Sequence, residues 1–79
     1  MVATGNDIIA IMKEAGIDPV VVGQLKFDVP LLKQGLDSID LPVIAVATEK
    51  KYSIDLSDAD ATKLRTINEF VIYVNQKLK

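Results

Sequence analysis

The chain has 79 residues, of which 49% are hydrophobic and 25% charged, and it carries a formal net charge of -2. This composition is typical of one folded soluble domain spanning residues 1–79, which we expect to act in the cytoplasm as a monomer. The slightly acidic balance argues against a nucleic-acid partner, and no apolar run approaches the roughly 20 residues that cross a membrane.

The sequence contains no cysteine and no histidine. Thiolate and imidazole metal ligands are therefore missing, and so is the usual general base. A serine in this chain has no familiar base beside it that would make it a nucleophile. We therefore expect neither an enzyme nor a metal site, and a functional serine would be a modification site.

The first predicted helix begins near Asn6, a favourable N-cap residue, and ends before Gly16. Its apolar residues recur at offsets of three, four and seven, which places them on one face of a helix. This face is expected to pack in the core. Its residues are Ile8, Ile11, Met12 and Ala15.

Residues 17–37 are predicted to form an ordered loop, because proline and glycine interrupt this stretch at short intervals. A short helical turn is expected at residues 20–24 or 30–33. A connection of about 20 residues needs apolar side chains that hold it onto the helices. Phe27 is the expected anchor, and filling the core is the simplest role for its ring.

The second helix is predicted from Ile39 to about Lys51, with Asp37 or Ser38 as its cap. It has two apolar stripes, of which only one can face the core. The other stripe is then either covered by the long loop or exposed as an interaction surface. The first stripe is Leu41, Ile44, Ala45, Thr48 and Tyr52, and the second is Ile39, Pro42, Val43 and Val46.

The remainder of the chain predicts an extended connector over residues 52–56, a short third helix over 58–63 and a last helix. Thr66 and Glu69 form a capping box that opens this last helix, which runs to about Leu78. The predicted fold class is therefore all-α. We expect a small four-helix bundle of three main helices and a short third one, with a long loop between the first two.

The residues Gly35 to Ile39 read Gly-Leu-Asp-Ser-Ile and place a hydroxyl at the start of the second helix. An aromatic residue, Tyr52, follows at the end of that helix, and Thr66 and Ile67 open the last one in the same register. With this pattern the chain resembles the acyl carrier protein family over nearly its whole length.

The resemblance implies that Ser38 carries 4'-phosphopantetheine, installed from coenzyme A by a phosphopantetheinyl transferase, and that Asp37 supports this modification. The arm would hold acyl groups as thioesters and carry them between acyl-transferring or condensing enzymes of fatty-acid, polyketide or related lipid synthesis. The acyl chain can also lie in the core in this family. The lining candidates here are Phe27, Ile44, Ala45, Thr48, Leu56, Leu64, Phe70 and Tyr73.

The second helix departs from the family pattern. The common fatty-acid carriers present glutamates there and dock onto basic patches of their partners, whereas this chain has Val43 at one such position and Lys50 and Lys51 at its end. We therefore expect a specialised carrier with a restricted set of partners. The expected partner-binding residues are Leu36, Ile39, Asp40, Pro42, Val43, Val46 and Glu49.

Two alternatives share the same fold. An aminoacyl or peptidyl carrier would use the same arm, and no motif in the sequence identifies the cargo. An unmodified interaction module would instead use the second apolar stripe to bind a protein partner.

Overall fold

The computed structural model describes residues 2–56 and 64–78. These residues contain no β-strand, which confirms the all-α fold class with three main helices. The short helix predicted over 58–63 lies outside the described residues. The helices are α1 (Gly5–Glu14), α2 (Pro19–Val22), the 3-10 helix η1 (Leu31–Gln34), α3 (Asp40–Tyr52) and α5 (Ile67–Leu78).

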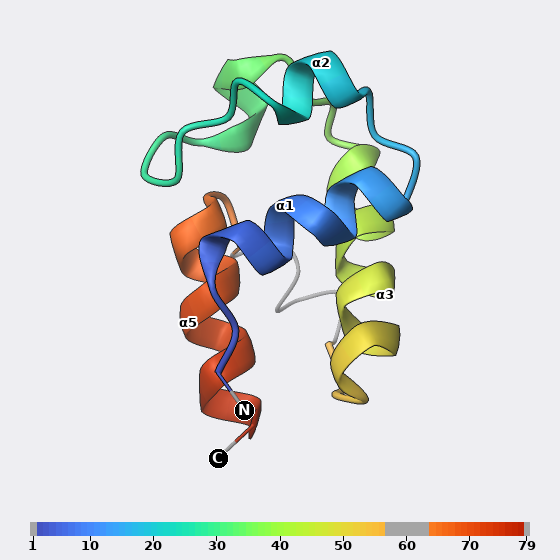
Figure 1. Cartoon of the computed structure of the whole chain (residues 1–79), viewed down its shortest axis with the longest axis vertical. Coiled ribbons are helices and arrows are strands. Elements are labelled where there is room, and N and C mark those ends of the chain that lie inside the picture. Colours follow the sequence, from blue (N-terminus) through green and yellow to red (C-terminus); the bar gives the residue numbers. More distant parts are fainter. Residues whose placement is uncertain (1, 57–63, 79) are drawn as a thin grey trace.

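Helix α1 is the centre of the packing. It contacts α2, α3 and α5, and Figure 1 shows it running across the molecule with α5 on one side and α3 on the other. Full burial of a large apolar side chain contributes about 1.5–3 kcal/mol, so these contacts supply most of the driving force for folding. Side chains with no exposed surface come from every main helix, and they include Ile8, Met12, Ile44, Ile67, Phe70 and Val74.

The N-terminal cap of α1 is Thr4, so the prediction of Asn6 was wrong. The Thr4 hydroxyl accepts the Asp7 N–H at 3.3 Å, and the Asp7 carboxylate accepts the Thr4 N–H at 2.9 Å. This reciprocal pair satisfies two backbone donors at once, which Asn6 does not do. At the other end of α1, Gly16 has φ 91°, a conformation that glycine adopts without strain. Ala15, which the sequence placed on the buried face of this helix, is only half-buried.

A short helical turn was expected at one of two places in the first connection, and the structure has one at each, α2 and η1. The Gln34 side chain holds the segment between them. Its Oε1 accepts the Lys26 N–H at 2.7 Å, and its Nε2 donates to the carbonyls of Lys26 and Val29 at 3.1 and 2.9 Å. A single amide side chain therefore closes the tip of this connection.

The apolar anchor of the connection is Leu31, not Phe27. Leu31 has no exposed surface, and its N–H donates to the Arg65 carbonyl at 2.8 Å. Phe27 is 38% exposed and lies against Gly5, so closely that a Cβ at residue 5 would overlap its ring. The prediction of Phe27 as anchor was wrong because its ring lies over backbone at the surface instead of entering the core.

Helix α5 begins as predicted, with a capping box. The Thr66 hydroxyl accepts the Glu69 N–H at 3.1 Å, and the Glu69 carboxylate accepts the Thr66 N–H at 3.1 Å. Near the other end of α5, Asn75 binds the start of the chain. Its Oδ1 accepts the Ala3 N–H at 2.7 Å and its Nδ2 donates to the Ala3 carbonyl at 3.1 Å.

We expect Asn75→Asp to lower the free energy of unfolding by about 1–3 kcal/mol, because the carboxylate cannot donate and leaves the Ala3 carbonyl facing a second acceptor. Urea denaturation measures the change. Gln76→Glu is the matched control, since it makes the same charge change at the next, exposed position of α5. Equal stability of the two variants would contradict this role for Asn75.

No helix in residues 2–56 and 64–78 is long and apolar enough to cross a membrane.

Candidate functional site

The turn before α3 presents Ser38 at the surface. Gly35 has φ 98°, which explains the glycine in the motif because other residues are strained in this conformation. Leu36 follows with 6% of its surface exposed and packs in the core. Asp37, Ser38 and Ile39 are then all exposed. The glycine turns the chain and the leucine holds it, so the serine projects beyond the core.

The first turn of α3 is closed by Asp40. Its carboxylate accepts the Asp37 N–H at 2.9 Å, and its own N–H donates to the Asp37 carbonyl at 2.9 Å. The prediction that Asp37 or Ser38 caps α3 through its side chain was wrong, because α3 has no side-chain cap at its N-cap position, Ile39. The Asp40 carboxylate caps the turn instead, by accepting the Asp37 N–H. The Ser38 hydroxyl has no hydrogen-bond partner among the described residues.

The N-terminus of α3 favours a phosphate next to Ser38. The backbone N–H groups of Ser38 and Ile39 have no partner within the described part of the chain. Free N–H groups and the positive end of a 13-residue helix together attract an anion. A phosphate ester on the Ser38 oxygen would therefore gain hydrogen bonds without displacing any that the described fold uses.

We expect Asp40→Ala to lower the free energy of unfolding by about 0.5–2 kcal/mol and to slow any modification of Ser38, since the turn that presents the serine loses its cap. Asp37→Ala makes the same charge change three residues earlier but removes a side chain without a hydrogen bond among the described residues. Its unfolding free energy should stay within about 0.5 kcal/mol of the unmodified sequence. Urea denaturation of both variants checks this, and equal losses would contradict the capping role of Asp40.

The second apolar stripe of α3 is exposed and not covered by the connection before it. Ile39, Val43 and Val46 are 72%, 45% and 50% exposed, and Pro42 is also exposed. Ile44, Ala45 and Thr48 on the opposite side are buried. Glu49 is half-buried at the edge of the exposed face, and Leu36, which the sequence placed among the partner-binding residues, lies in the core instead.

Most of the candidates for lining an acyl chain are core residues. Ile44, Ala45, Leu56, Leu64 and Phe70 are buried together with Thr48, whose hydroxyl donates to the Ile44 carbonyl at 2.8 Å. Phe27 and Tyr73 lie nearer the surface.

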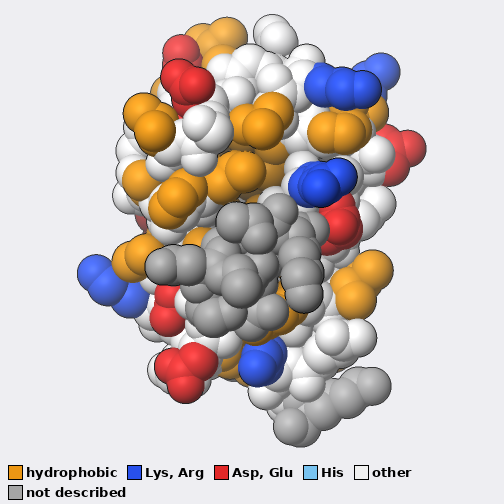
Figure 2. All heavy atoms as spheres, turned by 180° about the vertical axis from the view of Figure 1, so that it is seen from behind, with side chains coloured by type: hydrophobic (Ala, Val, Ile, Leu, Met, Phe, Trp, Pro, Cys, Tyr) orange, Lys and Arg blue, Asp and Glu red, His pale blue; other side chains and the backbone are white. Residues whose placement is uncertain are grey.

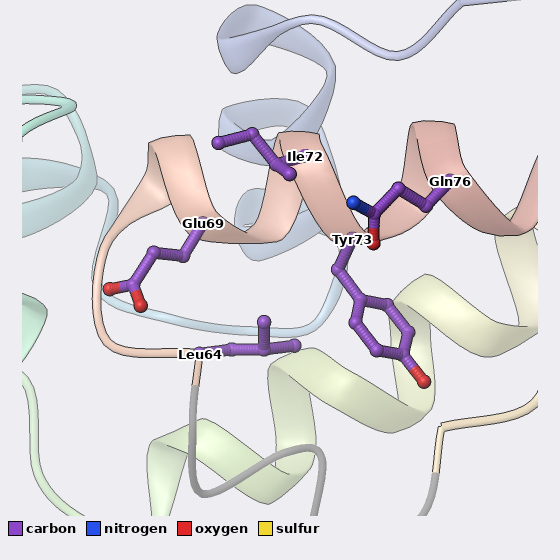
Figure 3. Close-up of a pocket in the computed structure, with 5 residues that line it drawn as sticks. All are labelled: Leu64, Glu69, Ile72, Tyr73 and Gln76. Atoms are coloured by element: carbon purple, nitrogen blue, oxygen red, sulfur yellow. The ribbon is translucent and has the colours of Figure 1, made fainter.

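A depression of about 200 Å³ lies on α5, and sequence reasoning did not anticipate it. Figure 3 shows Leu64 and Tyr73 on one side of the helix and Ile72 on the other. The Tyr73 hydroxyl donates to the Asp55 carbonyl at 3.4 Å, and the Lys77 ammonium lies 5.5 Å from the ring centroid. The signal in the sequence was Ile72, an apolar residue outside the buried stripe of α5. The lining residues are Leu64, Glu69, Ile72, Tyr73 and Gln76.

Comparison with known proteins identifies the family of this chain. The family model described as "Phosphopantetheine attachment site" matches residues 7–74. The chain is 39% identical to the meromycolate extension acyl carrier protein of Mycolicibacterium smegmatis, over 100% of this chain and 82% of that protein. It is 34% identical to an acyl carrier protein of Campylobacter jejuni, over 80% and 92% of the two chains, and 29% identical to one of Bdellovibrio bacteriovorus, over 87% and 86%.

This small helical fold presents an exposed serine at a helix N-terminus, and the serine hydroxyl has no hydrogen-bond partner among the described residues. Such an arrangement suits a non-catalytic carrier domain, which offers a side chain to other proteins on a helical support. The family match makes the cofactor phosphopantetheine. The chain belongs to the acyl carrier protein family, whose members carry acyl intermediates on this arm and are not enzymes.

Proposed function

We propose that the Ser38 oxygen carries the phosphopantetheine arm as a phosphodiester. The observation that carries this proposal is the exposed Ser38 hydroxyl beside two unpaired backbone N–H groups of the described chain. In the transfer from coenzyme A, a bond forms between this oxygen and the phosphorus that bears the pantetheine arm, while the pyrophosphate bond breaks and adenosine 3',5'-bisphosphate leaves. The hydroxyl proton goes to a base of the transferase, because this chain has no histidine or cysteine to take it.

Asp37 supports the same reaction. Its side chain is exposed and has no hydrogen-bond partner among the described residues, so its carboxylate is available to the magnesium ion used by the transferase. Asp40 is occupied in capping α3. The two neighbouring acids therefore take different parts, one in the modification reaction and one in holding the turn. The enzymes involved are a phosphopantetheinyl transferase and the synthase enzymes that family membership implies.

The cargo is that of a specialised lipid carrier. Relatives named meromycolate extension acyl carrier protein align with 100% of this chain at 37–39% identity. The exposed face of α3 also offers partners an apolar surface in place of the glutamates of common fatty-acid carriers. Partner enzymes would contact Ile39, Pro42, Val43 and Val46, with Asp40 and Glu49 at the edge. Equal turnover beside an ordinary carrier with general fatty-acid synthase enzymes would contradict this specialisation.

Loading in vitro tests the attachment site. The protein is incubated with coenzyme A, magnesium and a promiscuous phosphopantetheinyl transferase, and its intact mass is measured. We expect an increment of one phosphopantetheinyl unit, which peptide fragmentation places on Ser38. An increment on another residue would overturn the assignment. No increment, under conditions that load a control carrier, would favour the unmodified interaction module that the exposed face of α3 also suits.

A further inference from the structure

The N-cap residue of α3 and three exposed residues of the helix share one side. Ile39, Val43, Val46 and Lys50 are separated by four, three and four residues, which places them in one row along the axis. At about 1.5 Å per residue the row is about 16 Å long. We call these four residues the α3 strip. It starts next to Ser38 and is apolar over most of its length. Figure 2 shows hydrophobic side chains gathered on the face opposite to that of Figure 1, with charged side chains among and around them.

The charges beside the α3 strip are acidic at one end, whereas at the other end two exposed lysines outnumber the half-buried Glu49. Asp37 and Asp40 lie at the end next to Ser38, and Lys50 and Lys51 lie in the last turn of the helix. Neither lysine has an ion-pair partner among the described residues. A lysine at a helix C-terminus interacts favourably with the negative end of the helix dipole. Lys51, which lies beside the row, provides this interaction as well as Lys50 does. The dipole therefore does not explain why Lys50 lies in line with the apolar residues.

A protein surface that covers Val43 and Val46 necessarily approaches the Lys50 ammonium. Covering these side chains removes water from the contact. The sign of the charge on the facing surface of the partner then decides whether the contact is favourable. An acidic group there is attracted and a basic one is repelled. Charges at the edge of an interface act mainly on the rate and selectivity of association, and repulsion of wrong partners is a common source of specificity.

We propose that the α3 strip is a docking surface for partner enzymes, an inference that rests on the proposed carrier function. The matching enzyme surface is apolar beside the entrance for the arm and acidic about 16 Å further along. Lys50 selects these enzymes through its charge. A second copy of the chain is a weaker fit. A strip about 16 Å long and one helix wide, about 10 Å, covers roughly 160 Å², far below the roughly 800 Å² per partner of a stable interface. A brief contact with an enzyme needs less.

The test is a charge exchange with a matched control. Lys50→Glu/Lys51→Glu reverses the charge at the end of the α3 strip. Lys13→Glu/Lys77→Glu makes the same change in net charge, also in the last turns of helices, but on α1 and α5. All proteins are first loaded with phosphopantetheine, and loading is confirmed by intact mass. The probe is a condensing enzyme of general fatty-acid synthesis with a basic docking surface, assayed for kcat/KM with the acylated carriers at low and high salt.

We expect Lys50→Glu/Lys51→Glu to raise kcat/KM with this probe about tenfold at low salt, with the gain shrinking at high salt, and the control to change it less than about twofold. Lys50→Ala/Lys51→Ala, which removes the two positive charges without adding negative ones, should give an intermediate gain. An unchanged kcat/KM in both α3 variants, or an equal gain in the control, would overturn the inference and leave the carrier function standing. If the unmodified sequence sediments as a dimer and the α3 variants do not, the α3 strip binds a second copy of the chain, and the proposal of an enzyme partner is overturned. Failure of the unmodified sequence to load would overturn both proposals.

Discussion

Replacement of Ser38 by alanine is expected to abolish loading with phosphopantetheine completely, while the free energy of unfolding changes by less than about 0.5 kcal/mol. The hydroxyl is the proposed attachment atom, and among the described residues it makes no hydrogen bond that the fold would lose. Intact mass after incubation with coenzyme A, magnesium and transferase measures loading, and urea denaturation measures stability.

Ser53→Ala is the control for this variant. Ser53 is also exposed and also adjoins α3, but it lies at the C-terminal end, where the helix dipole is unfavourable for a phosphate. It should load like the unmodified sequence. Residual loading of Ser38→Ala would show that another hydroxyl accepts the arm. A loss of stability of more than about 1 kcal/mol would show that Ser38 also supports the turn, contrary to the geometry.

Leu31→Ala is expected to lower the free energy of unfolding by about 2–5 kcal/mol, a large part of the 5–15 kcal/mol typical of a domain. Leu31 has no exposed surface, and its removal leaves a cavity in the core beneath the first connection. Leu32→Ala is the matched control, because its side chain is 50% exposed and should cost less than about 1 kcal/mol. Urea denaturation compares the two, and similar losses would contradict the anchoring role.

The Leu31 substitution also bears on the proposed site. The connection that Leu31 anchors leads through Gly35 and Leu36 directly to Ser38. Loosening it should slow loading of the folded variant, because the transferase meets the serine in more than one arrangement of the turn. Single-turnover loading rates at a temperature where Leu31→Ala remains folded measure this effect. Unchanged rates would show that Asp40 alone is enough to hold the turn.

Features that depend on neighbours three or four residues apart were largely predictable from the sequence. The capping box of Thr66 and Glu69 is an example, because both hydrogen bonds form within four residues. The cap of α1 uses the same rule and was missed, since its acid is Asp7 in place of the more usual glutamate. The Asp40 cap was missed because the aspartate and serine ahead of it are both good caps on propensity.

The choice between the two stripes of α3 could not be made from spacing. Both stripes repeat at offsets of three and four, so each predicts a buried face equally well. The structure buries Ile44 and Thr48 because α1 packs on that side, and it leaves Val43 and Val46 exposed because the first connection does not cover them. This decision creates the surface offered to partner enzymes.

The sequence by itself determined the helices, the family and the serine next to a helix start, because these depend on local hydrogen bonding and on a short motif. Only the tertiary structure decided which stripe of α3 is buried and which residue anchors the first connection. Leu31 is held through Arg65, and Ala3 through Asn75, by hydrogen bonds between segments far apart in the chain. Such pairings depend on how α1, α3 and α5 pack together, and a local pattern does not encode that arrangement.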